Sequence, residues 1–178
     1  MIFATDRLIF RTWRPEDRAS FARMNADPAV MEYLPKVLSP EESDAFVDRI
    51  EKGLRERNYG LWAVELKDDC RFMGFIGFNY TDFPSDFTPC IEIGWRLAKE
   101  FWGKGYATEG ARSCLDFGFS TLGFTEVYSF TSKSNARSES VMMKIGMRKV
   151  RDFKHPKLEE SNPLCDHVLY RIAAGDRE

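Results

Sequence analysis

One stretch of this sequence constrains the fold more than any other, because a strand-like run leads through glycines into a helix. The strand-like run is Cys90 to Leu97, the glycines are Gly103-Lys104-Gly105, and from Gly105 to about Leu122 apolar and small residues recur at helical spacing. Glycines that open a helix leave backbone N–H groups without partners at the positive end of the helix dipole. This arrangement favours an anion site of the kind that holds a phosphate or pyrophosphate. A turn that merely links a strand to a helix would give the same pattern.

Two common nucleotide loops are excluded for this stretch. The sequence holds no Gly-x-x-x-x-Gly-Lys-Ser/Thr, and Gly103-x-Gly105 lacks the third glycine of the dinucleotide fingerprint. Any anion that binds here is therefore expected to be held by another kind of backbone cradle.

The order of predicted elements indicates a single α/β (α+β) layer domain that spans residues 1–178. A capping box at Ser39-Pro40-Glu41-Glu42 begins a helix that ends at Arg57, and Asn135 caps another that ends at Gly146. Two more helices are predicted, over 15–26 and over 105–122. Strands are predicted over 8–13, 61–66, 72–80, 90–97, 126–131, 147–153 and 166–172. Because strands and helices do not alternate regularly, we expect one mixed sheet with helices on both faces, not a doubly wound fold.

Composition narrows the class of function. The 178 residues are 43% hydrophobic, and 26 basic against 28 acidic side chains give a net charge of -2. A chain without a positive field is a poor candidate for nucleic-acid or membrane binding. No signal or spanning segment is predicted, so we expect a cytoplasmic protein. The four cysteines form no Cys-x-x-Cys, and no metal site is expected.

A second segment of the sequence makes the functional interpretation of the glycine turn more specific. Asn135-x-x-Ser138 and Lys144-x-Gly146 follow Trp102-Gly103-Lys104-Gly105-Tyr106-Ala107-Thr108-Glu109 at a distance of one predicted strand. Together these motifs resemble the GNAT superfamily of N-acetyltransferases, in particular the RimJ/RimL-like branch of ribosomal-protein N-terminal acetyltransferases. The resemblance extends over nearly the whole chain, from Leu8 to Ile172.

The resemblance implies a mostly antiparallel mixed sheet of about seven strands with a splayed central strand pair, and acetyl-CoA as cosubstrate. It implies that backbone amides of the glycine loop hold the pyrophosphate and that main chain near the end of the 90–97 strand pairs with the pantetheine arm. Structural roles are also open, because Asn135 is a good helix cap and Lys104 is as well explained by solvation. The implied cofactor-binding residues are Trp95, Arg96, Leu97, Trp102, Gly103, Lys104, Gly105, Tyr106, Ala107, Thr108 and Asn135.

The sequence offers fewer candidates for catalytic residues than for cofactor-binding residues. Alternation along the strand places Glu92, Gly94 and Arg96 on one face. Glu92 is the candidate base, and its structural alternative is an ion pair with Arg96 or another cation on the polar face of the sheet. The resemblance implies a tyrosine acid three residues before the helix-terminal glycine, where this chain has Met143. Ser138, one turn after Asn135, is then the candidate acid, and Ser140 is expected to project away. His155 and His167 are expected to be surface residues.

These observations predict an N-acetyltransferase that moves acetyl from acetyl-CoA to a primary amine, either a protein N-terminus or a small molecule, by direct attack in a ternary complex. The alternatives are a CoA-binding regulatory protein with weak or no turnover and a transferase of a longer acyl group. The loops that would select the acceptor carry no motif, and either a monomer or a homodimer is compatible with the sequence.

Overall fold

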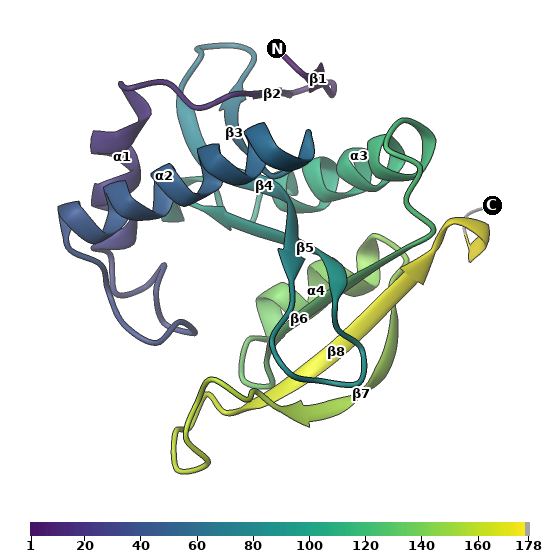
Figure 1. Ribbon diagram of the computed structural model, residues 1–178. Coiled ribbons are helices and arrows are strands. Elements are labelled where there is room, and N and C mark those ends of the chain that lie inside the picture. The colour runs from purple at the N-terminus through teal and green to yellow at the C-terminus, as the bar shows by residue number, and fades with distance from the viewer. Residues whose placement is uncertain (177–178) are drawn as a thin grey trace.

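The computed structural model describes residues 1–176 and consists of one twisted sheet with helices packed on it (Figure 1). The strands are β1 (Phe3–Ala4), β2 (Leu8–Arg11), β3 (Leu61–Leu66), β4 (Phe72–Thr81), β5 (Cys90–Leu97), β6 (Glu126–Ser132), β7 (Arg148–Lys154) and β8 (Asp166–Ala173). The α-helices are α1 (Asp17–Asn25), α2 (Pro40–Arg57), α3 (Tyr106–Ser120) and α4 (Ala136–Lys144), and two short 3-10 turns are η1 (Lys99–Phe101) and η2 (Ala174–Asp176).

The sheet is mixed and mostly antiparallel, as predicted. Its strand order is β1-β2-β3-β4-β5-β6-β8-β7, and β5 against β6 is the parallel pair. The prediction of about seven strands was one short, because β1 has only two residues and pairs through Phe3 with Phe10. A strand that short carries no periodic signal and is defined by its partner.

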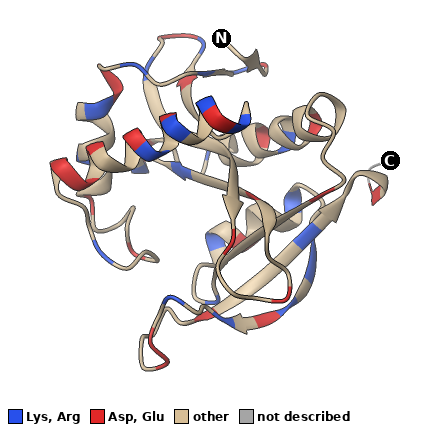
Figure 2. Cartoon of the chain, viewed as in Figure 1, with Lys and Arg blue, Asp and Glu red and all other residues tan. Residues whose placement is uncertain are grey.

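Helices cover both faces of the sheet, which confirms the predicted layering. On one face α1 and α2 pack through Phe21 and Val47 against Phe75 of β4. On the other face α3 and α4 pack on a larger core that includes Leu115 and Met142. In the described part of the chain, no helix is both long and apolar enough to cross a bilayer. Figure 2 shows the positions of basic and acidic residues interspersed along the elements.

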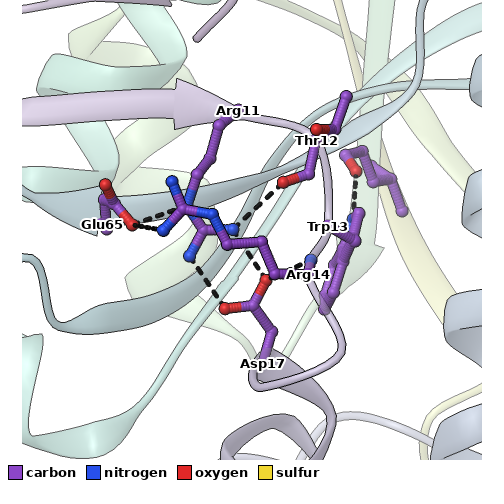
Figure 3. A network of polar contacts seen from close by, with 7 residues as sticks. Arg11, Thr12, Trp13, Arg14, Asp17 and Glu65 are labelled. Carbon is purple, nitrogen blue, oxygen red and sulfur yellow. Dashed lines mark hydrogen bonds and ion pairs between the residues drawn. The ribbon is translucent and has the colours of Figure 1, made fainter.

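Helix α1 begins later than the sequence pattern predicted, at Asp17 instead of residue 15. The reason is a buried ion-pair network (Figure 3) in which Arg11 of β2 donates to Asp17 at 2.7 and 2.8 Å and to Glu65 of β3 at 2.5 Å. Arg11, Asp17 and Glu65 are each less than 5% exposed. Because a buried cation requires nearby carboxylates, this network sets the start of α1 and its position on the sheet.

Helix α2 carries the capping box that the sequence predicts. The Ser39 hydroxyl accepts from the Glu42 backbone N–H at 3.2 Å, and the Glu42 carboxylate accepts from the Ser39 N–H at 3.0 Å. Two backbone donors that the helix itself leaves without partners are thereby paired.

We expect Ser39→Ala to lower the free energy of unfolding by about 1 kcal/mol, because it leaves one of these N–H groups without its partner. Urea denaturation followed by circular dichroism measures the change. Ser161→Ala, in the exposed loop between β7 and β8, is the matched control and is expected to change stability little. Equal midpoints for the two variants would show that the box contributes nothing to stability.

Candidate functional site

The site is a cleft where two neighbouring strands separate. Along the described chain β5 and β6 share a single bridge, Glu92 opposite Tyr128, and beyond it the serine hydroxyl of Ser129 donates to the Ile93 carbonyl at 2.9 Å. From Gly94 to Leu97 the edge of β5 that faces β6 has no strand partner, so the predicted splayed pair is confirmed. The cleft has a volume of about 970 Å³ and reaches from the start of α3 to the side of α2.

The glycine turn at one end of the cleft has the geometry of an anion cradle. Gly103 and Gly105 have φ of 72° and 81°, in the left-handed region that favours glycine. Gly105 is the residue before α3, so no side chain caps that helix, whereas α2 and α4 are capped by Ser39 and Asn135. The N–H groups of the first turn of α3 are therefore open to a ligand in the cleft. A Cβ on Gly103 would meet no atom within 4 Å, which leaves space for that ligand.

Two sets of side-chain contacts hold the glycine turn in place. The Trp102 indole N–H donates to the Leu97 carbonyl at 2.8 Å, and the Arg137 guanidinium lies 4.3 Å from the centre of a Trp102 ring. Arg7, from the segment between β1 and β2, pairs with Glu109 in the first turn of α3 at 2.6 Å. These contacts fix the cradle before any ligand binds.

The structure places nearly all of the sequence-predicted cofactor residues on the cleft wall. Lys104 is the exception: its side chain is exposed and is not part of the wall, while its carbonyl accepts from Arg7 at 3.0 Å. Contact of the Lys104 side chain with a cofactor therefore stays a prediction, with solvation as its alternative. The residues brought together on the wall are Trp95, Arg96, Leu97, Trp102, Gly103, Gly105, Tyr106, Ala107, Thr108 and Asn135.

Asn135 faces the cleft and also caps α4. Its Oδ1 accepts from the Ser138 N–H at 3.2 Å, and its Nδ2 donates to the Thr131 hydroxyl at 3.0 Å. Both ends of the amide are thus engaged within the chain. The structural role of Asn135 as a cap is present in the fold whether or not a ligand is bound.

Glu92 lies on the cleft wall beside the bridge between β5 and β6. Its Oε2 accepts from the hydroxyl of Thr81 at 2.7 Å and from the amide of Asn79 at 3.5 Å. Within residues 1–176 no group donates to Oε1 and no cation pairs with Glu92, so the expected alternative of an ion pair with Arg96 does not describe this carboxyl. Burial raises the pKa of Glu92, although Thr81 and Asn79 oppose the shift. A carboxylate with a raised pKa and a free oxygen is suited to accept a proton.

The hydroxyl groups of α4 are placed differently from the sequence prediction. Ser138 lines the cleft, but so does Ser140, which was expected to project away. The cleft wraps around the first turn of α4, so both faces of that turn reach it. Met143 is 56% exposed and is not part of the cleft wall.

The prediction that the two histidines are surface residues was wrong for His167, which is 9% exposed. The His155 and His167 rings lie 4.9 Å apart and pack against Phe83, Phe130 and Phe153 on the outer face of β6, β7 and β8. Burial lowers the pKa of His155 to about 4 and also lowers that of His167. Neither ring lines the cleft, so both serve packing.

Sequence reasoning missed the other wall of the cleft, which is the side of α2. Its side chains recur at helical spacing: Phe46, Arg49, Ile50, Gly53 and Arg57. The helical periodicity was visible, but the presence of two arginines on the inner side gave no signal of function. In the described chain, no three His, Cys, Asp or Glu side chains are grouped as metal ligands.

Comparison with known sequences points to one family. A sequence model described as "Acetyltransferase (GNAT) domain" matches residues 7–148. A relative from Bacillus subtilis, the uncharacterized N-acetyltransferase YnaD, is 32% identical over 173 residues, which cover 97% of this chain and 96% of the relative.

Solved structures share the fold. An acetyltransferase of the GNAT family from Bacillus anthracis superimposes with a TM-score of 0.80 at 26% identity, covering 97% of this chain and 98% of that one. The spermidine N-acetyltransferase from Vibrio cholerae, solved with CoA and spermine, has a TM-score of 0.75 at 17% identity, with 97% and 98% coverage. The second likeness is one of fold alone.

Proposed function

This chain belongs to the GNAT family of acetyltransferases, and on that premise we propose that it transfers the acetyl group of acetyl-CoA to a primary amine by direct attack in a ternary complex. The observation that carries the proposal is the cleft itself, which places an uncapped helix N-terminus, an unpaired strand edge and the Glu92 carboxylate along one continuous wall.

The donor half of the cleft fits a coenzyme A thioester. The Gly103–Gly105 turn and the first turn of α3 offer backbone N–H groups to the pyrophosphate, which is doubly anionic and compact. The unpaired edge of β5 from Gly94 to Leu97 offers main-chain groups to the amides of the pantetheine arm. Backbone N–H groups in this region would also polarise the thioester oxygen during attack.

Glu92 is proposed to prepare the acceptor. An α-ammonium group with a pKa of about 8 must lose one proton before its nitrogen can attack a carbonyl carbon. That proton passes to Glu92, directly or through water, and the nitrogen then forms the amide bond as the bond from carbon to sulfur breaks. The thiolate leaves with the sulfur electron pair and takes a proton from a donor in the cleft. The nitrogen gives up its second proton to that donor, so that a neutral amide and a free thiol are formed.

Ser138 is proposed as that donor, and we expect Ser138→Ala to lower kcat by about tenfold with little change in the KM of acetyl-CoA. The effect is modest because a thiolate with a pKa of about 8.5 is already a good leaving group. Steady-state kinetics of Ser138→Ala and Ser140→Ala are compared, since both hydroxyls line the cleft. A larger loss in Ser140→Ala would transfer the role to Ser140.

Acceptor and acyl group are tested together by one assay of turnover. Acetyl-CoA, propionyl-CoA and butyryl-CoA are each offered with peptide amines and with small amines, and both free thiol and acylated product are measured. We expect transfer to be fastest from acetyl-CoA, and we propose a primary amine, either a peptide α-amine or a small amine, as acceptor. Binding of CoA without transfer to any amine would favour a regulatory protein, and fastest transfer from butyryl-CoA would favour a longer acyl group.

A further inference from the structure

The acceptor half of the cleft is positively charged. Its wall includes Arg49 and Arg57 of α2 and Arg96 of β5, and Glu92 is the acidic residue among all the described residues that line the cleft. Arg137 and Lys144, on the side of α4, also line the cleft, and of these two Arg137 pairs with Glu32 at 2.8 Å. A cleft of this sign attracts anions and repels polycations.

Arg96 is the most unusual of these cations. Its guanidinium lies beside a pair of aromatic rings that contact each other edge to face, 5.3 Å from the centre of Phe46 and 5.4 Å from that of Phe75. Its Nη1 donates to Oδ1 of Asn25 at 2.7 Å, and Asn25 is itself fully buried and held by Ser43 through a 2.9 Å hydrogen bond. The head group is thus fixed in position by three different elements.

Arg96 nevertheless has no anionic partner in the described chain. A guanidinium has five N–H donors, and the single acceptor that it meets here is a neutral amide. Burial lowers the pKa of Arg96 to about 10, with no carboxylate to offset the effect. The contrast with Arg11 is direct, because the buried Arg11 pairs with both Asp17 and Glu65, whereas the partly buried Arg96 pairs with neither an aspartate nor a glutamate of the described chain. Partly buried cations are ordinarily paired, so a partner from outside the chain is indicated.

The path from Arg96 to the proposed base is open. Glu92, Gly94 and Arg96 lie on the same face of β5, and a Cβ on Gly94 would meet no atom within 4 Å. Residues four apart on a strand are separated by about 13 Å between Cα atoms. Since both side chains reach into the cleft, an extended acceptor of two to three residues could lie across Gly94 with its amine near Glu92 and its other end near Arg96.

We propose that the acceptor carries a carboxylate two to three residues from its reactive amine and that Arg96 binds this carboxylate. The inference rests on the proposed function and narrows it to an acidic, peptide-like amine. Arg49 and Arg57 supply long-range attraction, while the fixed guanidinium of Arg96 supplies a planar fork that suits a carboxylate. A polyamine such as spermidine has the wrong charge for this wall.

The test compares matched ligands on the CoA-bound protein by calorimetric titration. The ligands are dialanine, trialanine and their C-terminal amides, with spermidine as the polycation. For at least one length we expect the acid to bind about tenfold or more tightly than its amide, and spermidine to show no saturable binding. Equal binding of acid and amide at both lengths, or saturable binding of spermidine, would overturn the proposal.

Variants assign the preference to Arg96. In Arg96→Met, an unbranched side chain without charge occupies the space beside the two phenylalanine rings, and we expect the preference for the acid to disappear. Arg96→Lys is expected to keep part of it, because the charge remains and the fork is lost. The control Arg55→Met removes an exposed charge from the side of α2 away from the cleft. This variant is expected to keep the full preference for the acid.

Turnover separates this inference from the proposed function. With acetyl-CoA, Arg96→Met should raise the KM of the acidic acceptor and leave the KM of acetyl-CoA unchanged. A preference for the acid that survives in Arg96→Met would overturn the role of Arg96. Absence of acetyl transfer to every amine, with the acid still preferred in the titrations, would overturn the proposed function and identify the cleft as a binding site for acidic peptides.

Discussion

Gly105→Val is expected to abolish binding of coenzyme A, with a loss of at least about 100-fold in affinity. Gly105 has a φ of 81°, which a β-branched residue adopts only with strain. The glycine also immediately precedes α3, so a side chain there displaces the N–H groups of the first turn that are proposed to hold the pyrophosphate. Both effects act on the same ligand contact.

The loss is measured by calorimetric titration of CoA into the folded variant. Gly123→Val is the matched control, because Gly123 has a similar φ of 70° but lies in the turn after α3, outside the cleft wall. This control carries comparable backbone strain and is expected to keep its affinity for CoA. If Gly105→Val bound CoA as tightly as Gly123→Val does, the glycine turn would not be the pyrophosphate site.

Glu92→Gln is expected to lower kcat/KM by about 100-fold at neutral pH, because the amide cannot accept the proton of the incoming ammonium group. Much of the activity should return at high pH, where the amine is already neutral. The amide keeps the size of the carboxyl and can still contact Thr81 and Asn79, so little structural change is expected.

The pH profile gives a second measurement of the same role. A base must be deprotonated, so wild-type kcat/KM should fall as pH falls through the pKa of Glu92, which burial raises above its ordinary value. This acidic limb should be absent from Glu92→Gln. Glu126→Gln, which removes an exposed carboxylate on the adjacent strand β6, is the control and should leave both rate and profile near wild type. Near wild-type activity of Glu92→Gln at neutral pH would assign Glu92 a structural role.

The features determined by the sequence alone are those that depend on near neighbours in the chain. The start of α2 was predictable because a capping box requires only Ser39, Glu42 and the backbone between them. The glycine turn before α3 was predictable for the same reason, since Gly103 and Gly105 are needed wherever the chain adopts positive φ. Alternation along β5 placed Glu92 and Arg96 on one face before any partner strand was known.

The tertiary structure decided which of these residues share one cleft and what surrounds them. The bridge at Glu92 ends the pairing of β5 with β6, and this separation depends on how β6 pairs with β8 further along the chain. Side-chain periodicity places a residue on one side of its own helix or strand and does not show what packs against that side. Ser140 therefore reaches the cleft although the helix pattern predicted otherwise, and His167 is buried by aromatic residues from two other strands, Phe130 of β6 and Phe153 of β7.

Arg96 shows most clearly which properties follow from the sequence and which depend on the tertiary structure. Its place on the strand follows from sequence, whereas the absence of a carboxylate around it depends on Asn25, Phe46 and Phe75, which lie 71, 50 and 21 positions earlier in the chain. The pKa of a side chain is set by burial and by charges a few ångströms away, and only the folded chain brings those groups together. The sequence determined that this chain has a glycine turn at the start of a helix and a candidate base on the strand before it, and the packing of α1 and α2 on the sheet determined which cations lie on the opposite wall.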